Sequence, residues 1–278
     1  MIAILAMRIA VIGGAGRVGS QIAYALASST IPIERLQLYD IVDGVKGEVM
    51  DLQHAARALG KRLHVKEASL EECRGADVIV FVAGLPLSKA GTMDRNSLAR
   101  ENGKILKDTL GRLDDGRSVF VIITNPVDVM TQFAVNLIRD RHRVLGISTL
   151  TDMSRMEGPG YIIGEHGKNM LAIGNEEFDD AQVKQAGLDV VKLKGGTWFT
   201  VASIVRRVVA AIVNDEKALI PLSCSLHGEF GYSDVALSVP CVVGKNGMER
   251  IEKVNLTKEQ KAVMDRAAES VRSVLSSI

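Results

Sequence analysis

The chain has 278 residues, of which 34 are basic and 33 are acidic, so its formal net charge is +1. Because neither sign of charge forms a run, the sequence lacks the basic surface that nucleic acids or anionic membranes would require. Hydrophobic residues make up 47% of the chain, enough for one or two cores. We expect an oligomer whose interface covers the surplus apolar area.

Three cysteines, Cys73, Cys224 and Cys241, lie far apart and form no CxxC pair. This spacing predicts packing thiols in a reducing compartment, with neither disulfides nor a metal site. No apolar stretch is long enough to cross a bilayer. The apolar segment Met1–Met7 has no basic residue ahead of it and no small-residue cleavage site, so we expect no signal peptide and a cytoplasmic protein. Met7 is an alternative start, because the first predicted strand follows it directly.

The first half of the chain alternates short apolar runs with amphipathic segments. Unbroken apolar runs are typical of strands buried on both faces of a parallel sheet. This alternation predicts an α/β fold, a doubly wound parallel sheet of the Rossmann type, over residues 1–147. The predicted strands are Ile9–Ile12, Leu36–Tyr39, Val78–Ala83, Val119–Thr124 and Val144–Ile147, and the predicted helices are Val18–Ala27, Leu98–Leu113 and Val129–Ile138.

The second half, residues 148–278, predicts a separate α+β substrate domain. A helix is expected at Thr197–Val213, followed by a strand-rich stretch over Ile220–Ile251 in which Asn246-Gly247 forms a hairpin turn. Thr257-x-x-Gln260 is a capping box that predicts the start of a C-terminal helix.

A glycine-rich turn, Gly14-Ala-Gly16-Arg-Val-Gly19, follows the first predicted strand and opens a helix. Its first glycine permits a tight bend, the second lets the backbone approach a pyrophosphate, and the third lets helix and strand pack closely. Asp40 ends the next strand about 20 positions on, where an acid binds the adenosine ribose hydroxyls and repels a 2′-phosphate. The pattern predicts NAD as the cofactor, and Arg17 beside the phosphates keeps NADP as an alternative. A purely structural turn is the alternative.

The loop Gly164-Glu-His166-Gly167 places a histidine directly after the apolar strand Tyr161–Ile163. Histidine titrates near neutrality, so His166 can both take and return a proton. Asp152 is the candidate carboxylate partner that would hold its tautomer. Arg155 falls on the same helical face as Asp152, and its planar guanidinium can bind a substrate carboxylate bidentately. These residue types suit the reversible oxidation of a 2-hydroxy acid.

Two further segments complete the predicted site. Asn125, in Thr124-Asn125-Pro126, closes a strand where ligands meet an open α/β sheet, and could bind the substrate oxygen or the nicotinamide. A cis bond between Asn125 and Pro126 is plausible there. The glycine- and proline-containing segment Gly84–Arg95 is interpreted as a lid that brings Arg95 over the substrate carbonyl.

Together these motifs resemble the malate/lactate dehydrogenase family, in a form similar to archaeal malate dehydrogenases. The resemblance runs from about Arg8 to the C-terminal helix, and the ordered set is more specific than any single motif. The motifs are Gly14–Gly19, Asp51-Leu-Gln-His54, Ala83-Gly84-Leu-Pro86, Arg95 with Asn102, Thr124-Asn-Pro-Val-Asp128, Asp152-x-x-Arg155, Gly-Glu-His166-Gly and Lys194-Gly-Gly-Thr197.

The resemblance implies a role for each matching residue. His166 would be the acid/base, Asp152 its partner, Arg155 the carboxylate clamp, Arg95 the lid arginine and Asn125 a ligand of the carbonyl and nicotinamide. It also implies a homodimer or homotetramer and Thr197 in the pocket wall. The expected cofactor-binding residues are Gly14, Gly16, Arg17, Val18, Gly19, Asp40, Ala83, Gly84, Asn102, Thr124 and Asn125.

The lid departs from the family pattern. Similar malate-specific members carry an arginine just after the lid proline, whereas Leu87-Ser88-Lys89 follows Pro86 here. Lys89 could bind a second carboxylate as a point charge, and Leu87 could equally suit an apolar substrate. We therefore expect malate/oxaloacetate first, with lactate/pyruvate or dual use as the alternative.

The stretch from Arg155 to His166 is also short, because Met156-Glu-Gly-Pro-Gly160 breaks the helix almost at once. In the family this helix packs at a subunit interface and supports the residues equivalent to Asp152 and Arg155. The shortened helix makes a catalytically impaired dinucleotide-binding protein an alternative to an active enzyme. A third reading, an NAD-dependent glycosidase, would need a metal site that the cysteines and histidines do not form.

Overall fold

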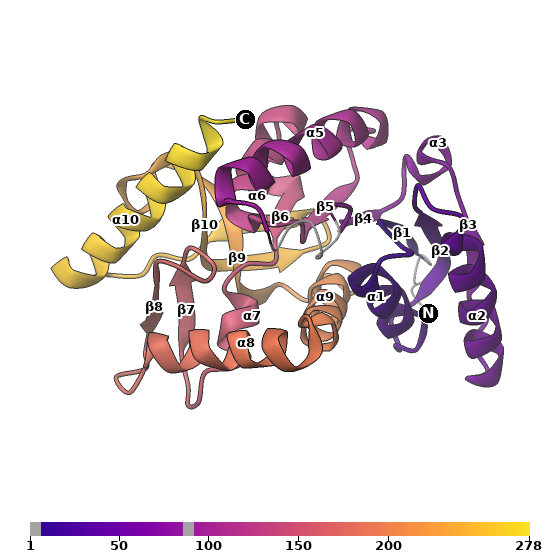
Figure 1. Ribbon diagram of the computed structural model, residues 1–278, viewed down its shortest axis with the longest axis horizontal. Helices are drawn as coiled ribbons and strands as arrows, with labels where there is room; N and C mark the ends of the chain where they lie inside the picture. The colour runs from indigo at the N-terminus through magenta and orange to yellow at the C-terminus, as the bar shows by residue number, and fades with distance from the viewer. Residues whose placement is uncertain (1–6, 86–91) are drawn as a thin grey trace.

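The computed structural model describes residues 7–85 and 92–278 of the chain (Figure 1). One sheet runs through it in the strand order β3-β2-β1-β4-β5-β6-β9-β10-β7-β8, with β11 paired to β10. Strands β3 to β6 are parallel, and from β6 onwards the pairing is antiparallel. The first six strands therefore have the order of a doubly wound dinucleotide-binding sheet, as predicted.

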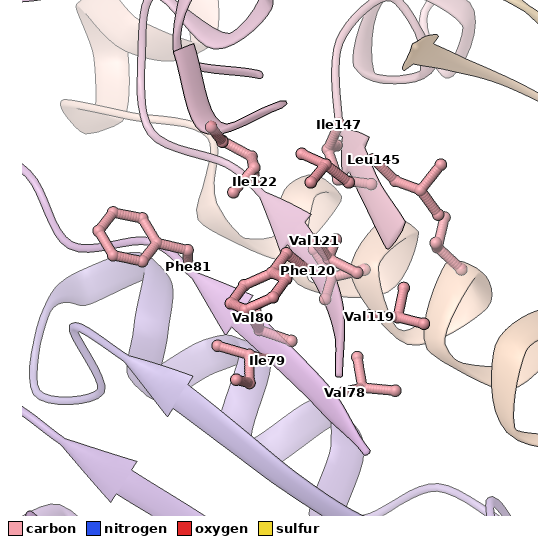
Figure 2. Close-up of a cluster of buried hydrophobic side chains, with 14 of the residues drawn as sticks. Val78, Ile79, Val80, Phe81, Val119, Phe120, Val121, Ile122, Leu145 and Ile147 are labelled. Atoms are coloured by element: carbon pink, nitrogen blue, oxygen red, sulfur yellow. The ribbon is translucent and has the colours of Figure 1, made fainter. Parts of the chain in front are cut away.

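The parallel strands form where the sequence has unbroken apolar runs. They are β1 Met7–Ile12, β2 Ile33–Tyr39, β4 Val78–Phe81, β5 Val119–Ile122 and β6 Val144–Gly146. Every residue of β4, β5 and β6 is buried, and Figure 2 shows their side chains packed together from neighbouring strands. The prediction missed β3 His64–Glu67, an edge strand with one buried residue, because that segment has no apolar run.

Helices connect and cover these strands. Predicted helices appear as α1 Arg17–Ala27, α5 Arg95–Leu113 and α6 Val127–Ile138. Helix α5 begins three residues earlier than predicted, because the Asp94 carboxylate caps the N–H groups of Asn96 and Ser97. The prediction did not include α2 Gly44–Ala58 or the short α3 Leu70–Cys73.

The second half continues the same sheet. Strands β9 Ala218–His227, β10 Ser233–Gly244 and β11 Gly247–Ile251 are antiparallel. The β10–β11 turn is Lys245-Asn246, one residue before the predicted Asn246-Gly247, because Gly247 already pairs with Gly244. Strands β7 Tyr161–Gly164 and β8 Met170–Ile173 form a hairpin at the far edge. The predicted boundary after residue 147 lies beside β6, where the pairing changes direction. It stays a prediction, because the sheet is continuous there.

Four helices accompany these strands: α7 Leu150–Met153, α8 Asp180–Lys194, α9 Trp198–Val213 and α10 Lys258–Leu275. The predicted capping box opens α10, with Thr257 and Gln260 bonded reciprocally. Helix α7 is a single turn, and the chain leaves it before Gly158 and Gly160, which both have positive φ. The structure thus agrees with the early helix break expected from the sequence.

The junction of the two halves predicts a strict requirement for glycine. A Cβ at Gly146 would lie 2.2 Å from Thr131 Oγ1 and 2.8 Å from Ser223 Cβ. We expect Gly146→Ala to destabilise the fold by about 1–3 kcal/mol, because the packed core must shift to admit a methyl group. Urea unfolding would measure this loss.

Gly111→Ala is the matched control, because a Cβ there meets nothing within 4 Å and the residue lies inside α5. Alanine should leave the protein unchanged or raise its stability by about 0.5–1 kcal/mol. Equal midpoints for the two variants would contradict the packing argument.

Candidate active site

The predicted phosphate-binding turn lies at the carboxyl end of β1, with the N-terminus of α1 behind it. A Cβ at Gly19 would lie 2.0 Å from the Gly13 carbonyl oxygen, so only glycine lets this helix approach the strand so closely. Gly14 is less tightly enclosed, since its Cβ would meet the Leu38 side chain at 3.0 Å. The cradle therefore has the close backbone packing that a bound dinucleotide pyrophosphate requires.

Asp40 lies at the carboxyl end of β2 and faces this turn. Its Oδ2 accepts a hydrogen bond from the Ala15 N–H at 2.9 Å, and its Oδ1 accepts one from the Ile41 N–H at 2.7 Å. The carboxylate is thus held beside the glycines where an adenosine ribose would lie. The residues of this half of the site fit NAD, and a negative charge here opposes a 2′-phosphate.

A cavity of about 530 Å³ opens next to the carboxyl ends of β4, β5 and β6. Ligands meet open α/β sheets at this edge. The cavity brings together many of the residues predicted for the site, from both halves of the chain. They are Val18, Gly84, Asn102, Thr124, Asn125, Asp152, Arg155, His166 and Thr197.

Asn125 is held by its neighbours at the end of β5. Its carbonyl oxygen accepts a hydrogen bond from Asn102 Nδ2 at 2.7 Å, and the Asn125–Pro126 bond is cis. Asn102 Oδ1 also accepts from the Leu85 N–H at 2.8 Å, while Thr124 Oγ1 donates to the Ala83 carbonyl at 2.7 Å. This network ties the β4 and β5 loops together and leaves the Asn125 side chain available to a ligand in the cavity.

His166 and Asp152 form the closest charged contact in the cavity. His166 Nδ1 lies 2.6 Å from Asp152 Oδ2, and Arg155 Nη1 donates to Asp152 Oδ1 at 3.0 Å. Asp152 is 1% exposed, whereas the His166 side chain is 29% exposed. A buried carboxylate therefore has a partner on each oxygen, and the imidazole reaches from it towards the cavity.

The surroundings of His166 raise its pKa above the usual value. Burial acts to lower the pKa, but the hydrogen bond to Asp152 and the charges of Asp152 and Asp128 outweigh burial and the opposing charge of Arg155. The protonated imidazole is consequently more stable than in water, which suits a group that must donate a proton near neutral pH.

Arg155 lies against helix α8, which the prediction missed. A Cβ at Gly187 would lie 2.8 Å from Arg155 Nη1, so the glycine leaves room for the guanidinium. Lys184, one turn earlier, also lines the cavity, as do Leu188 and Val191. The available sequence signals were Asp179, which caps α8, and Gly195, which ends it with positive φ. Between these two residues the helix has only a weak apolar face, which is why the sequence pattern did not reveal it.

Arg95 does not line this cavity: it forms an ion pair with the buried Glu165 and donates to Ser270 Oγ at 3.2 Å on α10. The expected placement of Arg95 over a substrate is thus not seen. Leu87 and Lys89 lie outside the described residues. Trp198, which the predicted site did not include, lines the cavity below Arg17 and Lys194.

Among the described residues, 7–85 and 92–278, no group of three or more His, Cys, Asp or Glu side chains could hold a metal ion. No helix in the same part of the chain is long and apolar enough to cross a membrane.

A doubly wound sheet, a glycine cradle with an acid beside it, and a histidine paired with a buried aspartate at the cavity define a dinucleotide-dependent oxidoreductase. Residues 7–146 match the lactate/malate dehydrogenase NAD binding domain, and residues 175–278 match the α/β C-terminal domain of the same family. The chain belongs to the lactate/malate dehydrogenase family, and NAD is its cofactor.

Sequence similarity to curated relatives extends along nearly the whole chain. L-lactate dehydrogenase 2 of Clostridium acetobutylicum is 29% identical, with 96% of each chain covered. L-lactate dehydrogenases of Borrelia hermsii and a Thermoanaerobacter species are 29% and 31% identical, covering 96% and 95% of this chain and 97% of each relative.

The comparisons also bear on the shortened segment. The alignment to the Clostridium enzyme spans 312 positions, more than the 278 residues present here, so the relative has stretches that this chain lacks. Residues 147–174, between the two matched ranges, carry Asp152, Arg155 and His166. The departure noted in the sequence therefore falls on the segment that holds the proposed chemistry.

The cofactor half of the site yields a direct prediction. Asp40→Ala should weaken NADH binding about 10–150-fold, because loss of a charged hydrogen-bonding group costs about 1.5–3 kcal/mol. It should weaken NADPH binding less, since the repulsion of the 2′-phosphate is also lost. Titration of cofactor fluorescence would measure both affinities.

The matched control is Asp43→Ala, which removes an exposed carboxylate three residues further on. Its NADH affinity should stay at the wild-type value. If Asp43→Ala and Asp40→Ala have the same affinity for NADH, Asp40 does not bind the ribose.

Proposed function

We propose that this protein is an NAD-dependent L-2-hydroxy-acid dehydrogenase in which His166 carries the substrate proton. The observation that carries the proposal is the 2.6 Å contact between His166 and the buried Asp152 at a cavity that Asn125 and Arg155 also line. Four polar groups at one place would not stabilise an apolar core, whereas the reaction requires all of them.

The bound nicotinamide would supply or accept the hydride. His166 Nδ1 faces Asp152, so Nε2 is the nitrogen left to exchange a proton with the substrate oxygen. During reduction of a 2-oxo acid, protonated His166 donates that proton, and Asp152 stabilises the imidazolium beforehand. During oxidation the neutral imidazole accepts the proton from the hydroxyl.

Arg155 would bind the substrate carboxylate. Only its Nη1 is used by Asp152, and a guanidinium has five N–H donors, so a planar pair of donors remains for a carboxylate. Asn125 would bind the substrate oxygen or the nicotinamide, with Thr197 in the wall of the pocket. Arg95 would polarise the carbonyl only after exchanging Glu165 for the substrate.

For the substrate we propose lactate/pyruvate first. The relatives above are each named L-lactate dehydrogenase, which favours the alternative drawn from the sequence over its leading expectation of malate. The apolar side chains Leu188, Val191 and Val201 line the cavity and suit a methyl group. Malate/oxaloacetate is the second candidate, because Lys184 lines the same cavity and could bind a second carboxylate.

We also propose a homodimer or homotetramer. Large apolar side chains are exposed along α8 and at the start of α9, and covering them would remove apolar surface from water. Light scattering of the purified chain would measure the assembly directly. Those exposed residues that do not line the cavity are Val190, Leu193 and Phe199.

The decisive assay is NADH oxidation at 340 nm with pyruvate and oxaloacetate side by side. We expect turnover with a higher kcat/KM for pyruvate, and a fall in kcat of about 10²–10⁴-fold in His166→Asn, which lacks the proton donor. His54→Asn, at an exposed histidine on α2, is the matched control and should keep wild-type activity.

A higher kcat/KM for oxaloacetate would instead support malate as the substrate. Folded wild-type protein that binds NADH and turns over neither acid would support the impaired binding protein, since the shortened segment would then have dismantled the site.

The pH profile gives a separate test. Because the pKa of His166 is raised, reduction of the 2-oxo acid should persist above the ordinary histidine pKa of about 6.5 and fall as the pH passes the raised value. Asp152→Asn removes the charge that stabilises the imidazolium, so the falling limb should move to lower pH. Steady-state rates from pH 5 to 10 would show this shift of the falling limb. A falling limb at the same pH in Asp152→Asn and wild type would exclude Asp152 as the partner of His166.

A further inference from the structure

Asp128 is a buried acid for which the proposed reaction has no role. It lies in the first turn of α6, three residues after Asn125, and is 1% exposed. Burial of a carboxyl group without a strong partner destabilises the folded protein, so the contacts of Asp128 indicate its role.

Its firmest contact is with the backbone of the proposed proton carrier. Asp128 Oδ2 accepts a hydrogen bond from the His166 N–H at 2.9 Å. His166 therefore meets two carboxyl groups, Asp152 at its ring from α7 and Asp128 at its backbone from α6. These two helices belong to different parts of the fold, so the histidine is held from two directions.

The loop that carries His166 has little stiffness of its own. Gly164 and Gly167 flank it, with φ of +104° and +76°, and glycine has more backbone freedom than any other residue. Glu165 closes the turn locally through its N–H bond to the Asn169 carbonyl. The bond to Asp128 connects this turn to the helix that begins beside Asn125.

Asp128 also contributes charge. Burial raises the pKa of Asp128, while the His166 N–H and the hydroxyls of Ser223 and Ser148 act against that rise. When it is ionised, its charge adds to that of Asp152 in favouring the imidazolium, and Arg155 opposes both. On the other sides of the loop, Glu165 is paired with Arg95, and Lys184 of α8 is paired with Asp180.

We propose that Asp128 is a positioning residue, which sets His166 in register with Asn125 through the His166 backbone N–H. The proposal rests on the proposed function only in taking His166 as the proton carrier. Small errors of placement matter in such a site, since a displacement of about 1 Å can cost about 10²-fold in rate.

The test compares Asp128→Ala with Asp128→Asn. Alanine removes the acceptor and leaves a buried N–H unpaired, so kcat with pyruvate should fall about 10–100-fold while NADH affinity is unchanged. Asparagine keeps an acceptor oxygen at the same place and should restore most of kcat. Gln132→Met, one turn further along α6, is the matched control, because Gln132 is buried and bonded to Asn136 instead of the catalytic loop.

Rescue by asparagine, with Gln132→Met at the wild-type rate, would support the proposal. Equal kcat values in the alanine and asparagine variants, whether normal or reduced, would overturn it. So would a loss in Gln132→Met as large as that in Asp128→Ala.

If Asp128→Ala does not fold, hydrogen exchange of the His166 backbone N–H, followed by NMR in wild type and Asp128→Asn, decides the matter. The N–H should be protected from exchange in both, because both keep an acceptor oxygen, and a freely exchanging N–H in either would overturn the proposal. This measurement needs no turnover, so it still reports on Asp128 if wild-type protein reduces neither pyruvate nor oxaloacetate, an outcome that would count against the proposed function alone.

Discussion

The hydrogen bond between His166 and Asp152 constrains the rest of the site. An almost wholly buried carboxylate is tolerated only when its oxygens are satisfied, and here His166 and Arg155 each take one. Asp152 lies in α7 and Arg155 in the turn that follows it, and the loop after β7 brings His166 to Asp152. Helix α8 packs close enough, through Gly187, to keep the guanidinium in place.

The sheet explains how residues so far apart in the chain meet. Parallel strands present their carboxyl ends along one edge, so the glycine turn, Asp40 and Asn125 lie in a row there. The antiparallel continuation from β6 into β9 and β10 then adds the β7–β8 hairpin at the far end of the sheet (Figure 1). The loop after β7 brings His166 to the same cavity as Asn125. Close packing at Gly146, where the two halves join, ties the cofactor side to the side that holds the proton carrier.

The short segment after Arg155 lies outside both ranges that match the family models. Residues 147–174 fall between the two ranges that match the family, yet the structure still pairs His166 with Asp152 and places Arg155 beside them. A one-turn α7 is enough for this arrangement, because the turn after it bonds the Arg155 N–H to the Asp152 carbonyl and so keeps the guanidinium beside the Asp152 carboxylate. The bond from Asp128 adds a second support for His166 that does not depend on the shortened helix.

Local sequence determined much of this protein. Unbroken apolar runs predicted the parallel strands, the glycine spacing predicted the cofactor turn, and Thr257-x-x-Gln260 predicted the start of α10, because each depends on neighbouring residues alone. Edge strand β3 and helix α8 escaped prediction, because neither has a strong apolar pattern and both are stabilised by long-range packing. Only the tertiary structure decided that Arg95 pairs with Glu165 and that Asp128 supports His166, because these contacts join segments 70 and 38 residues apart.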